Sequence, residues 1–388
     1  MTYILYAKRT PVGKMSGGLS QVPAPKLGSA LVSDALSETK IDPKKVDEII
    51  MGQVLSAGCG QAPARQAALH GGLSTQTQAL TINRVCGSGL KSVMLADQAI
   101  RLGDADIIFA GGQENMSLAP HLLPQSRQGY RFGSFTALDH MQHDGLWDPY
   151  NDVPMGDCGE TCADEYKFTR EQQDAFAIES YRRAQHAAEQ GFFKKEILPI
   201  EVQERKKTKT INQDEEPFGF DPEKLKSLRA AFRKDGSITA GNASSINDGA
   251  ALLVLAKEAS GHKPLAKIIA QASFAHAPEW FTTAPISCIK KVLEKANMKP
   301  EDIDLYEINE AFSCVTMAAI HDLKLDPEKV NIHGGAVSIG HPIGASGARI
   351  LVTLIHALKQ KGMKTGLATL CIGGGEASAV IIKICDES

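Results

Sequence analysis

The 388-residue sequence contains no long apolar run and no excess of charge of one sign. A membrane-spanning helix needs about 20 mostly apolar residues, and because no segment approaches that length we expect no membrane as a partner. The 42 Lys and Arg residues nearly balance the 45 Asp and Glu residues, and a net charge of −3 gives no general reason to expect nucleic acid binding. The beginning does not resemble a secretory signal and the end is not a peroxisomal tripeptide, so we expect a cytoplasmic protein.

The cysteines follow no disulfide framework. Eight of them are spread along the chain, and a chain of this length does not need disulfides for stability. Cys158 and Cys162 are separated by three residues but lack the second pair that a zinc site requires. We therefore expect mostly reduced cysteines that pack in the interior, and no metal.

The sequence does contain an internal repeat, which indicates two related halves. Residues 41–50 and 298–307 each place a proline, two charged residues, an aliphatic residue and an aspartate before a short apolar segment. Each follows a stretch with helical apolar spacing, which contains Leu27, Leu31 and Ala35 in one half and Ile289, Val292 and Leu293 in the other. Later in each half an apolar segment leads into Gly-Gly-x-Glu, at 111–114 and at 373–376, and we expect both strands to end there.

These patterns predict an α/β fold made of duplicated halves. Strands that alternate with helices indicate mixed, largely parallel sheets that are covered by layers of helices. Residues 119–247 interrupt the symmetry, are richer in charge and contain an amphipathic helix at 170–190. We expect a first half formed by 1–118 and 248–265, an inserted loop domain at 119–247 that binds substrate and forms oligomer contacts, and a second half at 266–388.

Cys86 is the first candidate for chemistry. It lies in NRVCGSGL (residues 83–90), between a strand-like run at 79–82 and a helix predicted from the spacing of Leu90, Val93, Met94 and Ile100. A helix N-terminus has free N–H groups and positive potential, so we expect it to favour the thiolate of Cys86. The local pattern alone also allows a buried structural cysteine beside an ordinary turn.

Three further segments combine polar groups with glycine-rich or apolar surroundings. His341 lies in HGGAVSIGHPIGASG (333–347), which has neither the Lys-Ser/Thr of a P-loop nor a GxGxxG, and is suited to act as the base for a cysteine. Cys371 ends an apolar strand before a glycine turn. Asn309 and Glu310 interrupt an apolar context, where strand-end capping explains them as well as catalysis does.

Together these segments resemble the thiolase family, from residues 10–13 to the last strand. The most specific matches are NRVCGSG around Cys86, NEAF from Asn309, GGAVSIGHPIGASGAR around His341 and CIGGGEASA from Cys371. The resemblance implies thiolase-type halves, each with a mixed five-stranded sheet and helices in layers. It also implies coenzyme A thioesters as substrates, without a metal or prosthetic group.

The resemblance assigns roles to five residues. Cys86 would be the nucleophile that carries the acyl group, and His341 would remove its proton. Cys371 would exchange a proton with the α-carbon of the second acetyl-CoA, with its pKa brought near the working pH by the glycine turn. His341 and a water held by Asn309 would form one oxyanion hole, and the N–H groups of Cys86 and Gly373 the other.

Residues 241–244 resemble the turn that binds the pantetheine arm of coenzyme A. The substrate contacts implied are Ser244, Ala240, Met155, Phe232, Phe312 and Leu146. The sequence departs from the family at Pro154, where a histidine is common, and at Pro217-Phe218, where a basic residue is common. We therefore expect the nucleotide end of coenzyme A to be held by Arg205, Lys206 or Lys207.

Residues 144–148 and Met155-Gly156 resemble short-chain, biosynthetic-type members, which implies reversible condensation of two acetyl-CoA molecules to acetoacetyl-CoA and free coenzyme A. A degradative thiolase for longer 3-ketoacyl-CoA is the close alternative. A carrier-protein-dependent condensing enzyme would use one Cys and two His, so Cys371 together with NEAF argues against it. The presence of all four polar candidates argues against a non-catalytic scaffold or lipid-binding module.

Two further expectations concern assembly and regulation. The resemblance implies a homodimer or a dimer of dimers, with the loop at 121–133 as the candidate tetramer contact. A disulfide between Cys86 and Cys371 that switches the enzyme off is a separate hypothesis.

Overall fold

The computed structural model describes residues 1–204, 207–258 and 262–385, and its centre is one mixed sheet. The strand order is β14-β15-β16-β13-β1-β12-β5-β3-β4, and β2 (Gly13–Lys14) pairs with β12. The strands of the main path are β14 (Leu305–Ile308), β15 (Thr365–Ile372), β16 (Glu376–Ile384), β13 (Ala266–Ala275), β1 (Thr2–Arg9), β12 (Asn247–Ala256), β5 (Ile107–Asn115), β3 (Glu48–Gly52) and β4 (Gln78–Ile82). Parallel pairs are β3–β4, β3–β5 and β14–β15, and the other pairs of the path are antiparallel.

The α/β fold class is confirmed, but the expectation of largely parallel strands is wrong, because three of the eight adjacent pairs of the path are parallel. The two halves meet edge to edge. Five strands of the path come from the first half and four from the second. They join where Thr2–Ile4 of β1 pair with Ala266–Ile268 of β13. This pairing satisfies backbone N–H and C=O groups that would be unpaired at the edges of two separate sheets.

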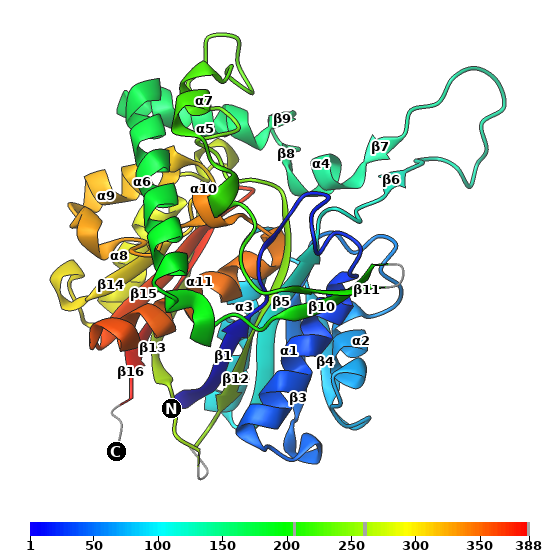
Figure 1. Cartoon of the computed structure of the whole chain (residues 1–388), viewed down its shortest axis with the longest axis vertical. Helices are drawn as coiled ribbons and strands as arrows, with labels where there is room; N and C mark the ends of the chain where they lie inside the picture. The colour runs from blue at the N-terminus through cyan, green and yellow to red at the C-terminus, as the bar shows by residue number, and fades with distance from the viewer. Residues whose placement is uncertain (205–206, 259–261, 386–388) are drawn as a thin grey trace.

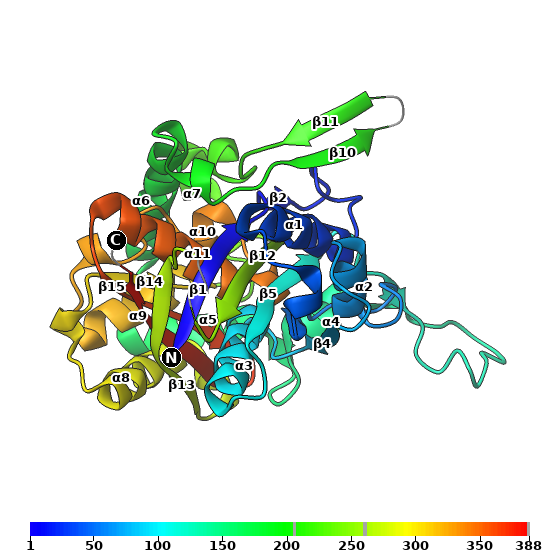
Figure 2. The ribbon, with the colours of Figure 1, turned by 90° about the horizontal axis from the view of Figure 1, so that it is seen from below.

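Helices form layers on both faces of this sheet (Figures 1 and 2). α3 (Ser88–Leu102) and α11 (Ile343–Lys361) pack on each other and on strands of both halves. α1 (Ala24–Thr39) and α2 (Pro63–His70) cover the outer face of the first half, and α8 (Ala284–Ala296), with α9 (Ser313–Leu323) beside it, covers that of the second. Because α11 is surrounded by protein, almost all its residues from Ile343 to Leu358 are buried, as expected of an interior helix.

The repeat found in the sequence is confirmed as a structural repeat. Each copy forms a short 3-10 turn that begins with its proline, η1 (Pro43–Lys45) after α1 and η5 (Pro300–Asp302) after α8. The apolar segment that follows becomes β3 in one half and β14 in the other. The same local sequence thus produces the same helix–turn–strand unit twice.

The two Gly-Gly-x-Glu segments differ, so the prediction that both strands end at their glycines is wrong for the first half. β5 continues through Gly111 and Gly112 to Asn115, because it pairs with β12 along its whole length. A Cβ on Gly111 would lie 2.0 Å from the carbonyl oxygen of Ala251, so glycine permits this close approach. In the second half Gly374 and Gly375 have φ of +88° and +85° and form the turn between β15 and β16.

The region between β5 and β12 contains the long helix α6 (Arg170–Glu189), which confirms the helix predicted at 170–190 to within one residue. Its N-terminus is capped by Thr169 and Gln172, and Gly191 follows with φ of +73°. The other elements between β5 and β12 are β6 (His121–Leu122), β7 (Leu138–Asp139), α4 (His140–Gly145), β8 (Trp147–Asp148), β9 (Val153–Pro154), α5 (Met155–Tyr166), η2 (Phe192–Lys195), β10 (Ile200–Glu204), β11 (Lys207–Ile211), η3 (Pro217–Gly219) and α7 (Pro222–Ser227). The domain boundaries assigned from the sequence stay a prediction.

Two parts of this region project from the body. The β6–β7 loop extends away in both views, and the β10–β11 hairpin stands out in Figure 2. Lys207 is exposed at the start of β11, whereas Arg205 and Lys206 lie outside the described residues. The second half also contains η4 (Pro278–Trp280), η6 (Pro327–Lys329) and α10 (Ala336–Ile339). In the described parts of the chain, no helix combines the length and apolarity that a membrane crossing requires.

Candidate active site

Cys86 lies in a strained turn between β4 and α3, as the sequence predicts for its position. Val85 has φ of +44°, which is rare for a β-branched residue. Three hydrogen bonds hold this conformation: Val85 N–H donates to Asn83 Oδ1 (2.9 Å), Ser88 Oγ donates to the Val85 carbonyl (2.7 Å), and Arg84 N–H donates to Ser88 Oγ (2.8 Å). Strain that is held in this way is common at functional sites, because it fixes a side chain where relaxed backbone would not.

The thiol of Cys86 is close to the turn that follows β15. The backbone N–H groups of Gly373 and of Cys86 itself lie close enough to the sulfur to favour its charged form. Burial nevertheless raises the pKa of the Cys86 thiol to about 12, with those two N–H groups acting in the opposite direction. The prediction that the helix N-terminus favours a thiolate is therefore wrong for the free protein, because loss of hydration outweighs the backbone dipoles.

Cys371 is fully buried near the end of β15, and the two thiols interact. Burial raises the pKa of Cys371 well above its usual range, and negative charge on Cys86 raises it further. The glycine turn therefore does not bring the Cys371 pKa near neutrality in the free protein. In the free protein both thiols are protonated at neutral pH.

His341 lies between α10 and α11 and is buried. Its backbone N–H donates to Asn247 Oδ1 (2.9 Å), and its Nδ1 is 2.6 Å from Ser346 Oγ. Because the Ser346 hydroxyl donates its one hydrogen to the Pro342 carbonyl (2.9 Å), it accepts from Nδ1–H of His341. This leaves Nε2 with a free lone pair, and no described residue hydrogen-bonds to it. Burial, and then the charge of Arg349, lower the pKa of His341 to about 3, so the ring is a neutral base.

The adjacent polar residues Asn309 and Glu310 differ in their hydrogen bonding and therefore in what they can do. Glu310 accepts hydrogen bonds from Ser180 Oγ (2.7 Å), Asn331 Nδ2 (2.8 Å) and the Val337 N–H (3.2 Å). It therefore joins the end of β14 to α6 and to the segment before His341. Asn309 is 1% exposed, and both polar atoms of its side chain lack partners among the described residues, so its amide is available to a ligand.

A buried ion pair lies behind the histidine. Arg349 Nη1 on α11 is 3.7 Å from Glu307 Oε2 on β14, and both residues are almost fully buried. Burial raises the pKa of Glu307 to about 8, with the nearby Arg349 acting in the opposite direction. Because Arg349 also lowers the pKa of His341, it is one of the charges that keep the imidazole neutral.

A second buried carboxylate fixes the loops next to Cys86. Glu114 on β5 accepts N–H groups from Val54 (2.9 Å), Leu55 (3.2 Å) and Gly344 (3.0 Å). Burial raises the Glu114 pKa to about 7, and these three bonds act in the opposite direction. Reasoning from the sequence missed Glu114, Asn247, Ser346 and Arg349. Ser346 and Arg349 lie within the GHPIGASGAR segment, whereas Asn247 gave no signal.

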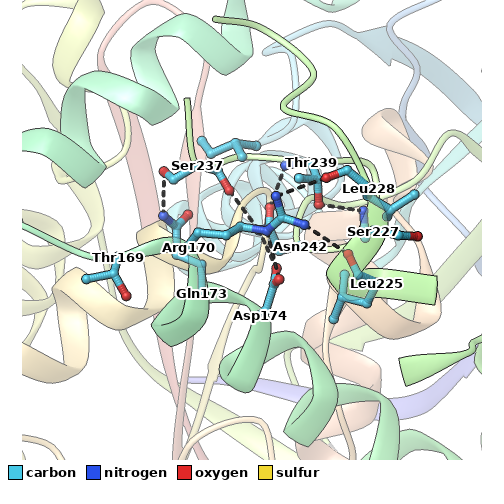
Figure 3. A network of polar contacts seen from close by, with 12 residues as sticks. Thr169, Arg170, Gln173, Asp174, Leu225, Ser227, Leu228, Ser237, Thr239 and Asn242 are labelled. Carbon is cyan, nitrogen blue, oxygen red and sulfur yellow. Dashed lines mark hydrogen bonds and ion pairs between the residues drawn. The ribbon is translucent and has the colours of Figure 1, made fainter. Parts of the chain in front are cut away.

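The turn proposed to bind pantetheine is held by a network from α6 (Figure 3). Asn242 is fully buried, and its Nδ2 donates to Asp174 Oδ1 (2.8 Å) and to the Ser237 carbonyl (3.0 Å). Asp174 in turn accepts from Arg170 Nε (2.7 Å). Arg170 also donates to two carbonyls at the end of α7, those of Leu225 (2.9 Å) and Leu228 (3.1 Å). Asn242 therefore shapes the turn from inside and leaves Ala240 exposed.

The structure brings five of the six predicted substrate-contact residues into one series of contacts toward the thiols. Ser244 Oγ donates to the Ala311 carbonyl (2.9 Å), next to Phe312. The rings of Phe312 and Phe232 meet edge to face with centroids 6.0 Å apart. Phe232 covers Gly156, and the neighbouring Met155 lies beside Gly373 and bonds through its N–H to the Leu146 carbonyl (3.0 Å). Ala240, the sixth, lies on the same turn as Ser244. The roles of all six stay predictions.

An apolar cavity of about 380 Å³ lies elsewhere, between α6 and α9. Phe168, Phe176, Met317 and Ile320 form much of its wall, and its lining includes Glu310 but none of Cys86, His341 and Cys371. The two thiols, His341 and the amide of Asn309 lie outside this cavity. We therefore take the thiol site, and not the cavity, as the candidate active site. Among the described residues, no group of three or more His, Cys, Asp or Glu is arranged to hold a metal ion.

Known proteins resemble this chain over nearly its whole length. A family model described as "Thiolase, N-terminal domain" matches residues 2–259, and one described as "Thiolase, C-terminal domain" matches residues 262–384. A protein of Allochromatium vinosum named acetyl-CoA acetyltransferase is 50% identical, over 98% of both chains. Acetyl-CoA acetyltransferase 1 of Arabidopsis thaliana is 51% identical, over 98% of this chain and 93% of its own.

A solved structure agrees with this similarity. The crystal structure of the Bacillus anthracis acetyl-CoA acetyltransferase superposes with a TM-score of 0.97 at 40% sequence identity. The alignment covers 99% of this chain and 98% of that one.

The opposed pKa shifts of Cys86 and His341 predict a pH profile. The alkylation rate of Cys86 by iodoacetamide, followed by peptide mass spectrometry, should rise from pH 7 to pH 10 without a plateau near the usual thiol value. The physical reason is that burial raises the Cys86 pKa to about 12. No inflection from His341 should occur near pH 6.5, because its pKa is lowered to about 3. A plateau below pH 9 would contradict this assignment.

The Asp174 network predicts a role in coenzyme A binding. Asp174→Ala removes the acceptor that links Arg170 to Asn242, so the turn at 237–244 should loosen and the affinity for coenzyme A should fall about 10-fold, or ~1.4 kcal/mol. Isothermal titration calorimetry would measure it, with Glu189→Ala as the control, since Glu189 is exposed at the far end of the same helix. If folded Asp174→Ala protein binds coenzyme A as tightly as the wild type does, the turn is not part of the binding site.

Proposed function

Because the chain belongs to the thiolase family, we propose that it is an acetyl-CoA acetyltransferase that interconverts two acetyl-CoA molecules with acetoacetyl-CoA and free coenzyme A. The observation that carries this proposal is the contact between the Cys86 and Cys371 loops, beside which the chain supplies a neutral histidine. Relatives of about half-identical sequence that bear this enzyme name support it.

In the first half-reaction Cys86 attacks the thioester carbon of acetyl-CoA. His341 Nε2 takes the thiol proton, coenzyme A leaves as the thiol with that proton, and the acetyl group remains on Cys86. With the Cys86 pKa raised and the His341 pKa lowered, a separated thiolate–imidazolium pair is not the resting state. Proton transfer that accompanies attack on the carbonyl avoids this charged pair.

In the second half-reaction Cys371 takes a proton from the methyl group of another acetyl-CoA. The resulting carbanion attacks the acetyl carbon on Cys86, a carbon–carbon bond forms, and the bond to the Cys86 sulfur breaks. The Cys86 thiolate takes the proton held by Cys371, and acetoacetyl-CoA is released. Since burial holds the Cys371 thiol protonated in the free protein, substrate contacts must lower its pKa before it can act as a base.

Two groups of hydrogen-bond donors are suited to stabilise the negative charge that develops on the reacting oxygen atoms. The N–H groups of Cys86 and Gly373 lie near the nucleophile sulfur, and the oxygen of a tetrahedral intermediate, bonded to the carbon next to that sulfur, would lie within their reach. The Asn309 amide, which lacks a partner among the described residues, would hold a water for the enolate oxygen together with His341. Loss of one such donor typically costs on the order of 10²–10³ in rate.

The wall near Cys86 supports a short acyl group. Cys86 and Leu146 both border a cluster made of Val54, Leu55, Met116, Met141 and Ile343. Met155 lies against the Gly373 turn from the other side. These apolar side chains suit a short acyl group. We further propose a cytoplasmic role in fatty acid metabolism. Of the three basic residues expected to hold the coenzyme A nucleotide, Lys207 is exposed, whereas Arg205 and Lys206 lie outside the described residues.

Thiolysis of acetoacetyl-CoA by free coenzyme A tests the activity directly. We expect robust turnover by the wild type and a loss of at least about 10³-fold in both Cys86→Ser and Cys371→Ser. Much faster turnover of a long-chain 3-ketoacyl-CoA would favour the degradative type of thiolase instead. If the wild type is inactive on both substrates, the thiols serve another acyl acceptor.

We also propose that the protein is a homo-oligomer, either a dimer or a dimer of dimers. β4 is the outermost strand of the sheet, and Leu80 on it is 41% exposed, so its edge is suited to pair with a second copy. The β6–β7 loop carries exposed Phe132 and Phe135 away from the body, which is typical of a contact surface.

Static light scattering would test the loop surface. Replacing Phe132 and Phe135 with Ser should convert a tetramer to a dimer and leave thiolysis intact, because the loop is remote from the body. A tetramer that survives this change would exclude the loop as the contact.

A further inference from the structure

The Cys86 turn and the glycine turn after Cys371 touch at several points. The backbone N–H of Gly373 lies close enough to the Cys86 sulfur to favour its charged form. A Cβ on Gly87 would lie 2.3 Å from Ile372 Cδ1, so these residues are already in close contact. A Cβ on Gly373 would lie 3.5 Å from Val85 Cγ1. The position of one turn therefore depends on the position of the other.

One ion pair joins these two turns. Arg84, two residues before Cys86, donates from Nε to Oε2 of Glu376, the residue that follows the three glycines, at 2.8 Å. Arg84 Nη1 donates to Ser273 Oγ on β13 (2.9 Å) and to Ser378 Oγ on β16 (3.3 Å). The side chains of Arg84 and Glu376 are 21% and 35% exposed, so the pair is partly shielded from water.

The strained residue lies between the ion pair and the thiol. Val85 is held at φ of +44°, and relaxation of its backbone would turn Cys86 away from Gly373. Local hydrogen bonds from Asn83 and Ser88 fix the turn within its own segment. Of the contacts described, only those of Arg84 tie it by hydrogen bonds between side chains to strands of the second half.

We propose that Arg84 and Glu376 are a pair of positioning residues that hold the Cys86 turn against the Cys371 turn, so that the Gly373 N–H stays on the reacting sulfur. The expected change in kcat rests on the proposed function, whereas the expected change in the position of the Cys86 turn does not. Lys91 provides a contrast: it lies near Arg84 and Glu376 on α3, where Arg84 contributes to lowering its pKa, yet it belongs to neither turn.

A double-mutant cycle tests this proposal, with wild type, Arg84→Ala, Glu376→Ala and the double variant compared at saturating and limiting substrate. We expect each single variant to lower kcat for acetoacetyl-CoA thiolysis on the order of 10-fold, because small displacements of reacting groups cost that much or more, with KM changed less than about 2-fold. The double variant should lose no more than either single one, because residues that act as a unit are not additive. Lys91→Gln should stay within about 2-fold of wild type in kcat.

A second readout does not require thiolase activity. Peptide mass spectrometry gives the iodoacetamide alkylation rates of Cys86 and Cys371 in the same variants. Cys86 should change its rate by at least about 3-fold when the pair is broken, whereas the partly buried Cys59, whose pKa neither Arg84 nor Glu376 shifts, should not change. If wild type lacks thiolysis, the proposed function fails while this readout still decides the positioning role.

Several results would overturn the proposal. These are an unchanged kcat in both single variants, losses that add in the double variant, or an equal loss in Lys91→Gln, which would indicate a general field effect. If Arg84→Ala does not fold by circular dichroism, Arg84→Lys and Glu376→Gln replace the alanine variants. A lysine ammonium is a single point of charge and lacks the planar guanidinium that presents separate Nε and Nη1 donors to Glu376, Ser273 and Ser378, so Arg84→Lys should still lower kcat.

Discussion

The first turns of α3 and α11 lie so close that there is no room for side chains between them. A Cβ on Gly347 would be 2.4 Å from the Leu90 nitrogen, and a Cβ on Gly89 would be 2.8 Å from the Ala348 nitrogen. Because Cys86 immediately precedes α3 and His341 immediately precedes α11, this contact brings the nucleophile and its base to the same place. Gly112 and Gly52 allow the adjoining strands to approach equally closely.

The buried charges follow from this close packing. Loops that must stay near one another need polar anchors, and Glu114 and Glu310 each accept three hydrogen bonds from segments distant in sequence. Burial raises the pKa of both carboxyl groups and of the two thiols, and lowers that of His341. The site is therefore held in a low-charge state until substrate arrives, and the glycine N–H groups are ready for charge that forms during reaction.

Much of this arrangement could be predicted from the sequence, for identifiable reasons. The α1–η1–β3 and α8–η5–β14 units follow local rules, since proline opens each 3-10 turn and the apolar spacing defines each helix. The turn at Cys86 was also predictable, because an apolar strand, glycines and a helical pattern adjoin there. The family resemblance named the four polar candidates, and the structure places them at the ends of β14 and β15 and at the starts of α3 and α11.

The errors have a common cause, which is that burial and pairing depend on distant residues. Gly111 and Gly112 look like a turn, yet β5 continues because β12, far along the chain, pairs with it. The helix N-terminus suggested a thiolate at Cys86, but the surrounding side chains remove water and raise the pKa. The partners Arg84 and Glu376 are 292 residues apart, and nothing in either segment indicates the other.

The interior position of α11 has a consequence for how the chain is made. Strands β1, β3 and β5 and helix α3 are complete by residue 115, but α11, which together with α3 covers their inner face, begins at residue 343. At ribosomal rates, roughly 11 to 46 seconds separate these two points of synthesis. During that interval the nascent first half exposes an apolar face that it cannot cover by itself, so folding of the two halves must be completed together, after translation has nearly ended.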